Sequence, residues 1–450
     1  MRTRVGAKWV ALLGLVVVGC QGGRGTEVEL QRGRQLYTAQ CAGCHGAKAD
    51  GQGELASYLT PRPRDLTNGI LKYRTTEGTT PSPVEILQTV KVGVPGTAMP
   101  GWDLLSDKDW RALVAYLQHL IPRYVAARPG PRIEIPTKLA TSPAVVSAGE
   151  QLFARSGCVA CHGKDGQGNG PSAVGLTDTW GNAVVPRDLT RGPLKWGSRD
   201  EEIYRTLAVG IPGTPMPGYA RSLNATELWQ LVHYIQSRLQ LPEGFDPSHP
   251  KRSLLRVARV SGELPLDPTA AAWQGVKAVP VYLHHVTAGQ ESTEWVLVKA
   301  IGNAQEIAFA VRWADDAMNP EVGNGDGVAL QFPVRAPADP AALPFVAMGS
   351  ADNPVQIWAW RAPEQITEWR AKGVGHQSMI EATERQLQAT GKYLQGEWEV
   401  VLRHPLQGVV AQDAVLERTG YVAFAVWDAD RPDRNQPKSF SDWVVYEYVP

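Results

Sequence analysis

Two hydrophobic periods divide the chain. Between about residues 27 and 240, apolar side chains recur at helical spacing, which predicts helices over 29–40, 107–121, 148–156 and 225–239. From about residue 255 the period changes to two, as Ile307, Phe309 and Val311 alternate with smaller or polar residues. Similar alternation predicts strands over 279–285, 398–402, 421–427 and 444–449. The pattern therefore predicts small all-α domains followed by a mainly β sandwich domain.

Proline-rich stretches separate these regions and are expected to be semi-extended linkers. At roughly 150 residues per domain, a chain of 450 residues is long enough for about three domains. The predicted domains are 27–125, 145–240 and 255–450, with linkers at 126–144 and 241–254.

The N-terminus has the features of an export signal. Basic residues precede an apolar run over 9–19, which is shorter than the roughly 20 residues of a membrane-spanning helix. The run ends in Val-Val-Gly-Cys20, which resembles the lipobox of bacterial lipoproteins and implies that Cys20 carries a lipid anchor. An ordinary signal peptide over 1–20 is the alternative. Either interpretation predicts an extracytoplasmic protein, and the first predicts a membrane-anchored lipoprotein on the periplasmic side.

Charge excludes one class of partner. The chain has 45 Lys and Arg against 45 Asp and Glu, so it lacks the basic surplus with which proteins neutralise nucleic-acid phosphates. No nucleic-acid partner is expected.

An internal repeat carries the strongest chemical signal. The segments Cys41-Ala42-Gly43-Cys44-His45 and Cys158-Val159-Ala160-Cys161-His162 are offset by 117 residues. Gly-Pro-rich loops around Met99 and Met216 repeat with the same offset, so that each methionine follows its motif histidine by 54 residues. Duplication of one domain explains this spacing.

Each Cys-x-x-Cys-His motif is the attachment signature of a c-type haem. The two thiols can bond to the haem vinyl groups, and His45 or His162 can ligate iron from one side. Met99 and Met216 are then the predicted second ligands, because a loop methionine can reach the other haem face. A disulfide, a zinc half-site or a thioredoxin-like pair remains the alternative for a single Cys-x-x-Cys.

Other residues of the repeat allow more than one interpretation. Arg64 and Arg187, each preceded by proline, are candidates for pairing with haem propionates or are ordinary surface residues. His119 and His233 lie on the predicted terminal helices and are expected to be packing or surface residues. Both repeats resemble class I cytochrome c domains.

Three segments of the third domain, 345–360, 424–428 and 438–443, carry a further resemblance. In these segments the domain resembles the haem b domain of the ethylbenzene dehydrogenase family. In that family a methionine and a lysine hold haem b without covalent bonds, and these ligands map onto Met348 and Lys438. Lysine binds iron only when neutral, which a buried site favours.

Competing interpretations exist for the haem b ligands. Histidine is a common haem ligand, so His284 and His285 are rival candidates. Because neighbouring residues of a strand point to opposite faces, at most one of the two is expected to point toward the haem. If they do not bind haem, Met348 is expected to be an ordinary core methionine and Lys438 a solvated charged residue. Four more residues fit no motif and are expected to be structural: Met318, Met379, His376 and His404.

The resemblance implies an electron-transfer subunit with two covalent c haems and one haem b. Members of the family are γ subunits of molybdenum enzymes related to dimethyl sulfoxide reductase, and the domain arrangement resembles the cytochrome subunit of nitrate reductases and nitrite oxidoreductases. The implied partners are iron-sulfur and molybdopterin subunits, together with a quinol-linked or soluble cytochrome redox partner. Since the cysteines are assigned to haem and lipid, substrate chemistry is expected on another subunit. A dihaem peroxidase, which needs an open iron position, and a haem-based redox sensor are the alternatives.

Overall fold

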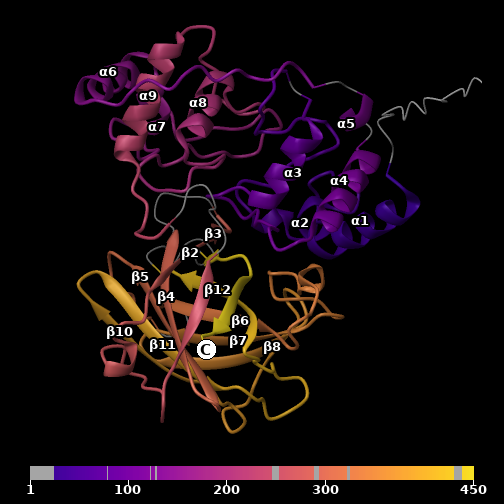
Figure 1. Ribbon diagram of the computed structural model, residues 1–450, viewed down its shortest axis with the longest axis vertical. Helices are drawn as coiled ribbons and strands as arrows, with labels where there is room; N and C mark the ends of the chain where they lie inside the picture. Colours follow the sequence, from indigo (N-terminus) through magenta and orange to yellow (C-terminus); the bar gives the residue numbers. More distant parts are fainter. Residues whose placement is uncertain are drawn as a thin grey trace, which may run out of the picture.

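The computed structural model describes residues 25–78, 80–121, 123–126, 129–245, 253–287, 293–321, 325–429 and 438–449. The predicted signal segment and Cys20 lie outside these residues. Helices occupy the first half of the chain and strands the second (Figure 1). The predicted order of helical domains followed by a mainly β domain is therefore confirmed. No helix in the described part of the chain has the length and apolarity needed to cross a membrane.

The first helical domain is built around two crossing helices, α1 and α4. A capping box between Thr26 and Glu29 begins α1, and the Ser106 side chain accepts a hydrogen bond from Asp109 N at the start of α4. The helices cross at Gly33, where a Cβ would lie 2.1 Å from the carbonyl oxygen of Ala112. The elements are α1 (Glu27–Gln40), α2 (Ala42–His45), η1 (Ala56–Tyr58), α3 (Pro83–Val92), α4 (Asp107–Leu120) and α5 (Arg123–Ala126).

The second helical domain repeats this plan. Its first helix begins at Pro143, five residues before the predicted start, because Ser142 caps it and proline suits the first helical turn. Gly149 provides the helix crossing, since a Cβ there would lie 2.1 Å from the carbonyl oxygen of Gln230. The elements are α6 (Pro143–Arg155), α7 (Cys158–His162), α8 (Asp200–Val209) and α9 (Ala225–Arg238).

The β domain is one continuous curled sheet rather than two separate sheets. Its strands follow the order β10-β11-β5-β4-β1-β14-β12-β6-β7-β8-β9, with β2, β3 and β13 attached at the side. The N-terminal part of β12 pairs with β14 and its C-terminal part with β6, so this strand joins the two halves of the sandwich. The bounds are β1 (Leu254–Arg259), β2 (Val279–Tyr282), β3 (His284–His285), β4 (Trp295–Gly302), β5 (Glu306–Ala314), β6 (Gly327–Pro333), β7 (Val355–Arg361), β8 (Gln365–Ala371), β9 (Gln377–Met379), β10 (Gln388–Leu394), β11 (Glu397–Pro405), β12 (Thr419–Trp427), β13 (Lys438–Phe440) and β14 (Val444–Tyr448).

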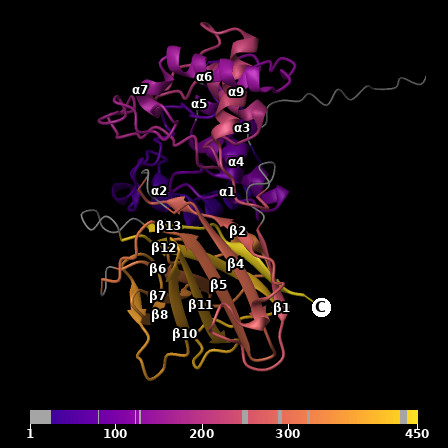
Figure 2. The same ribbon diagram turned by 90° about the vertical axis from the view of Figure 1, so that its left-hand side faces the viewer.

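Alternating side chains from both halves of the curled sheet fill a single core. Phe309, Phe332 and Trp358 are almost completely buried there, and Phe332 and Trp358 have ring centroids 4.1 Å apart. Aromatic rings of this size account for much of the apolar area that the domain buries. The core therefore fixes the positions of β6, β7 and β12. These strands extend from the core toward the helical domains (Figure 2).

The first helical domain lies between the second helical domain and the β domain (Figure 2). Gln40 donates to the carbonyl oxygen of Leu343, and the amide of Gly101 donates to Asp442 at 2.9 Å. The second helical domain also reaches the β domain, through an ion pair of 2.6 Å between Arg187 and Glu294. Direct polar contacts thus fix both helical domains on the β domain.

Candidate haem sites

The Cys-x-x-Cys-His motif of the first domain forms the short helix α2 directly after α1. The His45 Nδ1–H donates to the carbonyl oxygen of Arg64 at 3.1 Å, which leaves Nε2 available as a ligand. Burial lowers the pKa of His45 and so favours the neutral ring that binds iron. Burial also raises the pKa of the Cys41 and Cys44 thiols, to about 12 and about 11.

The second motif repeats this geometry in α7. His162 Nδ1–H donates to the carbonyl oxygen of Arg187 at 2.9 Å, and burial lowers the pKa of the ring. Arg64 and Arg187 occupy equivalent positions after proline. Their backbone carbonyls therefore orient the two histidines in the same way.

The methionine loops lie against the same cavities as the motifs. Met99 lines the cavity that contains Cys41, Cys44 and His45, and Met216 lines the cavity that contains Cys158, Cys161 and His162. The loops are closed alike, because Val94 N donates to Met99 O at 3.0 Å and Ile211 N to Met216 O at 3.1 Å. Each repeat thus brings two thiols, one imidazole and one thioether to one cavity.

The alternatives for the cysteine pairs receive no support. None of these four cysteines forms a disulfide within the described residues. Among the described residues, metal-ligating side chains cluster at Asp315, Asp326 and Asp428. No described cysteine belongs to a cluster of this kind. The methionine of each repeat lines its cavity, so neither repeat favours the open iron position of a peroxidase.

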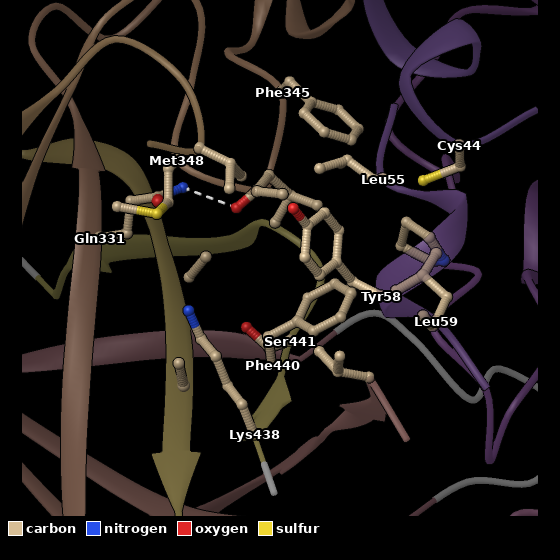
Figure 3. A pocket seen from close by; sticks show the side chains of 18 of the residues that line it. Cys44, Leu55, Tyr58, Leu59, Gln331, Phe345, Met348, Lys438, Phe440 and Ser441 are labelled. Atoms are coloured by element: carbon tan, nitrogen blue, oxygen red, sulfur yellow. Dashed lines mark hydrogen bonds between the residues drawn. The ribbon is translucent and has the colours of Figure 1, made fainter. Parts of the chain in front are cut away.

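Met348 and Lys438 meet in the β domain and point into the same space from two sides (Figure 3). Met348 has a φ of 71°, an uncommon conformation for a residue with a side chain, and its carbonyl accepts from Gly373 N at 2.9 Å. Gln331 donates to the carbonyl oxygen of Val346 at 3.0 Å and so holds the segment that carries Met348.

Lys438 begins β13 and pairs in register with Trp427 of β12. Burial, with a smaller contribution from the charge of Arg361, lowers the pKa of Lys438 to about 8. This downward shift of the pKa is in the direction that the neutral lysine ligand implied by the sequence resemblance requires.

The rival histidines do not line this cavity. His284 Nε2 lies 3.0 Å from Asp442 Oδ1, and His285 Nδ1 lies 3.0 Å from Ser439 Oγ. Neither histidine therefore points into the haem cavity, although both are buried, which the sequence did not predict. Both side chains of strand β3 are covered, since Tyr282 packs edge-on to His284 and the strand lies at the end of the β domain that faces the helical domains (Figure 1).

The remaining candidates lie away from the cavities. Met318 and Met379 are 51% and 53% exposed, and His404 Nε2 lies 2.9 Å from Glu368 Oε1 in the β core. His376 and His119 are exposed. In the second domain, His233 Nε2–H donates to the carbonyl oxygen of Leu139 at 2.7 Å, as expected for a packing residue.

One cavity of about 640 Å³ contains both the first-domain ligand set and the Met348–Lys438 pair. Tyr58, Leu55 and Leu59 of the first domain and Phe345 and Phe440 of the β domain line it between the two sets (Figure 3). A methyl group added at Gly43 would lie 3.7 Å from the Phe345 ring, so the β domain packs against the attachment motif itself.

The second-domain ligands line a separate cavity of about 360 Å³. Pro61 and Lys72 of the first domain line this cavity and the larger one, so they lie between the two. Lys72 and its counterpart Lys195 were not identified as candidates from the sequence. The available signal was a second repeat, Leu71-Lys72-Tyr73 and Leu194-Lys195-Trp196, offset by 123 residues.

Comparison with known proteins agrees with this organisation. Residues 28–117 match the family described as cytochrome c oxidase, cbb3-type, subunit III, residues 146–238 match cytochrome c, and residues 270–379 match ethylbenzene dehydrogenase. The chlorate reductase subunit gamma of Ideonella dechloratans is 30% identical over 203 residues, which cover 42% of this chain and 82% of the relative. The chain belongs to the family of this γ subunit.

Two further proteins are similar to the chain. A putative respiratory nitrate reductase heme subunit of Haloferax mediterranei is 28% identical over 198 residues, covering 41% of this chain and 69% of the relative. A chain in the structure of the reducing HAO-like protein complex of Kuenenia stuttgartiensis is 33% identical, with a TM-score of 0.46, and the match covers 48% of this chain and 99% of that one. The γ-subunit family and the two cytochrome matches together identify a haem-containing electron-transfer subunit of an oxidoreductase complex.

Proposed function

We propose that this protein is a three-haem electron-transfer subunit of an extracytoplasmic molybdenum oxidoreductase, of the nitrate reductase or nitrite oxidoreductase type. The observation that carries the proposal is the single cavity that joins a Cys-x-x-Cys-His-Met ligand set to the Met348–Lys438 pair. A bound haem supplies a one-electron iron couple, and closely spaced couples form a path for electrons.

The two helical domains each hold one covalent c haem. The thiols of Cys41 and Cys44, and of Cys158 and Cys161, form the covalent bonds. The backbone carbonyls of Arg64 and Arg187 hold the ligating histidines in one tautomer, which is the usual role of the second hydrogen bond of a metal-bound imidazole. The residues that would bind iron are His45 and Met99 in the first domain and His162 and Met216 in the second.

The β domain holds one non-covalent haem b between Met348 and Lys438. Apolar side chains of β6, β7 and β12 exclude water from this space, among them Ala329, Ile357 and Phe424. The lowered pKa of Lys438 supports its role as a neutral amine ligand. Without a covalent tether, this haem depends on its axial bonds and on the packing of the pocket.

The positions of the cavities support a linear order of the three centres. The first-domain site lies between the haem b site, with which it shares a cavity, and the second-domain site, from which Pro61 and Lys72 separate it. Electrons therefore pass through the first domain on their way between the other two. The molybdopterin and iron-sulfur subunits exchange electrons with one end of this series, and a quinol-linked or soluble cytochrome partner with the other.

Haem analysis of the purified full chain tests the proposal. Pyridine haemochrome spectra should give one extractable b haem for every two covalent c haems. Pull-down from the native host should recover a molybdenum enzyme with iron-sulfur clusters. A wild-type protein without extractable haem contradicts the haem b assignment, and a protein with fewer than two covalent haems contradicts the assignment of the repeats.

A further inference from the structure

Four basic residues converge where the two helical domains meet. Arg64 and Lys72 of the first domain line the larger cavity, and Arg187 and Lys195 of the second domain line the smaller one. Lys72 lines both. The cations therefore lie beside the proposed c-haem sites and not on an outer surface.

Three of these cations form no close ion pair in the described part of the protein, although the charge of Asp178 acts on Arg64 and Lys72 from a greater distance. All three guanidinium nitrogens of Arg64 are buried without a hydrogen-bond acceptor, and the group lies 3.9 Å above the ring of Trp180. Lys72 and Lys195 form no ion pair with any described acidic residue. Arg187 differs, because it pairs with Glu294 at 2.6 Å and donates to two backbone carbonyls.

The surroundings disfavour charge on the two lysines. Burial and the charge of Arg64 lower the pKa of Lys72 to about 8, and burial together with Lys72 and Arg187 lowers the pKa of Lys195 to about 7. Burying several cations together without close ion pairs is unfavourable. Such a cluster is therefore suited to bind anionic groups that compensate it.

The junction is built from equivalent residues of the two repeats. Tyr73 and Trp196, which directly follow the two lysines, stack with ring centroids 5.0 Å apart and an interplanar angle of 9°. Arg64 reaches the other domain's methionine loop, since a Cβ at Gly213 would lie 3.3 Å from its Nη1. Arg187 reaches the first domain's methionine loop in the same way, since a Cβ at Gly96 would lie 3.0 Å from its Nη1. Each domain thus contributes cations that lie beside the other domain's site.

We propose that Arg64, Lys72 and Lys195 form one shared site that binds propionate carboxylates of both c haems. The proposal rests on the attachment of a haem in each helical domain. Haem propionates are carboxylates, and arginine and lysine bind carboxylates through charge-assisted hydrogen bonds. Because the cations are shared, each one contributes to the electrostatic potential at both irons, and the two c haems form an electrically coupled pair.

Reduction potentials of variants of the full chain test this sharing. Lys72→Met and Lys195→Met should each lower the equilibrium constant for reduction of both c haems by about three- to tenfold, since removing a nearby buried positive charge disfavours the reduced state. A tenfold change corresponds to about 59 mV for a one-electron couple. Lys72→Arg, which keeps the charge, should restore the potentials to within about twofold of wild type.

Two exposed lysines provide matched controls. Lys48 and Lys164 closely follow the two histidine ligands but line neither cavity, so Lys48→Met and Lys164→Met should leave both potentials within about twofold of wild type. Unchanged potentials in both Lys72→Met and Lys195→Met contradict the proposal, as does a shift confined to the haem of the mutated domain. The covalent haem count of the wild-type protein is measured separately, so a failed haem assignment is distinguished from a failed propionate site.

Discussion

The proposed axial ligands would set the reduction potential of each iron. His45 and His162 are held by equivalent backbone carbonyls, so the two c sites have the same histidine orientation. Met99 and Met216 occupy loops closed by the same hydrogen bond. Differences between the two c potentials must then come from the surroundings of the haems rather than from their ligands.

Replacing one methionine ligand should affect one centre only. Met99→His and Met216→His should each leave the covalent haem attached but lower its reduction equilibrium constant by more than about tenfold, because imidazole is a stronger donor to ferric iron. Redox titration measures the effect, and the two unmutated centres of the same molecule serve as controls. An unchanged potential in either variant means that its methionine is not a ligand.

Removing the lysine ligand should affect only the non-covalent haem. Lys438→Ala should abolish the haem b spectrum or convert it to high spin, because that haem lacks a covalent tether. Both c haems should persist at wild-type stoichiometry and remain reducible by small-molecule donors. A normal haem b spectrum in this variant would exclude Lys438 as a ligand, and Lys392→Ala, a change at an exposed lysine of β10, is the matched control.

At the scale of elements, the repeated helix crossing fixes the position of each attachment motif. Gly33 of α1 and Gly149 of α6 allow the first helix of each domain to contact the last one at backbone distance. Each of these helices leads directly into a Cys-x-x-Cys-His motif. A larger side chain at the crossing would displace the motif relative to its methionine loop.

A substitution at the crossing should therefore destabilise its domain. Gly33→Ala should lower the free energy of unfolding of the first domain by about 1–3 kcal/mol, because the added Cβ would overlap the backbone of α4. Thermal unfolding followed through the first c-haem spectrum measures the loss. Gly43→Ala is the control, since Ala160 already occupies the equivalent position of the second repeat. Equal unfolding temperatures for the two variants would contradict this account of the crossing.

The duplication and both motifs were predictable from the sequence, because covalent haem attachment imposes a fixed local spacing. The junction of Lys72 and Lys195 was not, since it depends on how two separately folded domains pack together. The burial of both His284 and His285 was also missed. Alternation along a strand predicts one exposed face only when one face of the strand meets water, and β3 is covered on both.

At the scale of the whole molecule, the first helical domain lies between most of the second helical domain and the β domain (Figure 2). It shares a cavity with the β domain and a cationic junction with the second helical domain. The second domain and the β domain are also joined directly, through Arg187 and Glu294. These contacts hold the proposed redox centres at constant separations.

The proposed lipid anchor at Cys20 should be removable without loss of the proposed haems. Cys20→Ser should release the protein into the soluble extracytoplasmic fraction while both c haems stay attached, because different cysteines serve the two modifications. Fractionation followed by haem staining measures the outcome, with Cys41→Ser as the contrasting variant that should disturb haem attachment. Retention in salt-washed membranes, in a strain that lacks the partner subunits, would contradict the lipoprotein assignment.

The packing of Phe345 against Gly43 has a consequence for biogenesis. Covalent attachment of haem requires a synthase to reach the thiols of Cys41 and Cys44, and in the folded protein the β domain lies against that motif. The proposed haem of the first domain would therefore have to be attached while the β domain is still undocked. Maturation of the protein would then follow a fixed order, in which haem attachment precedes docking of the β domain.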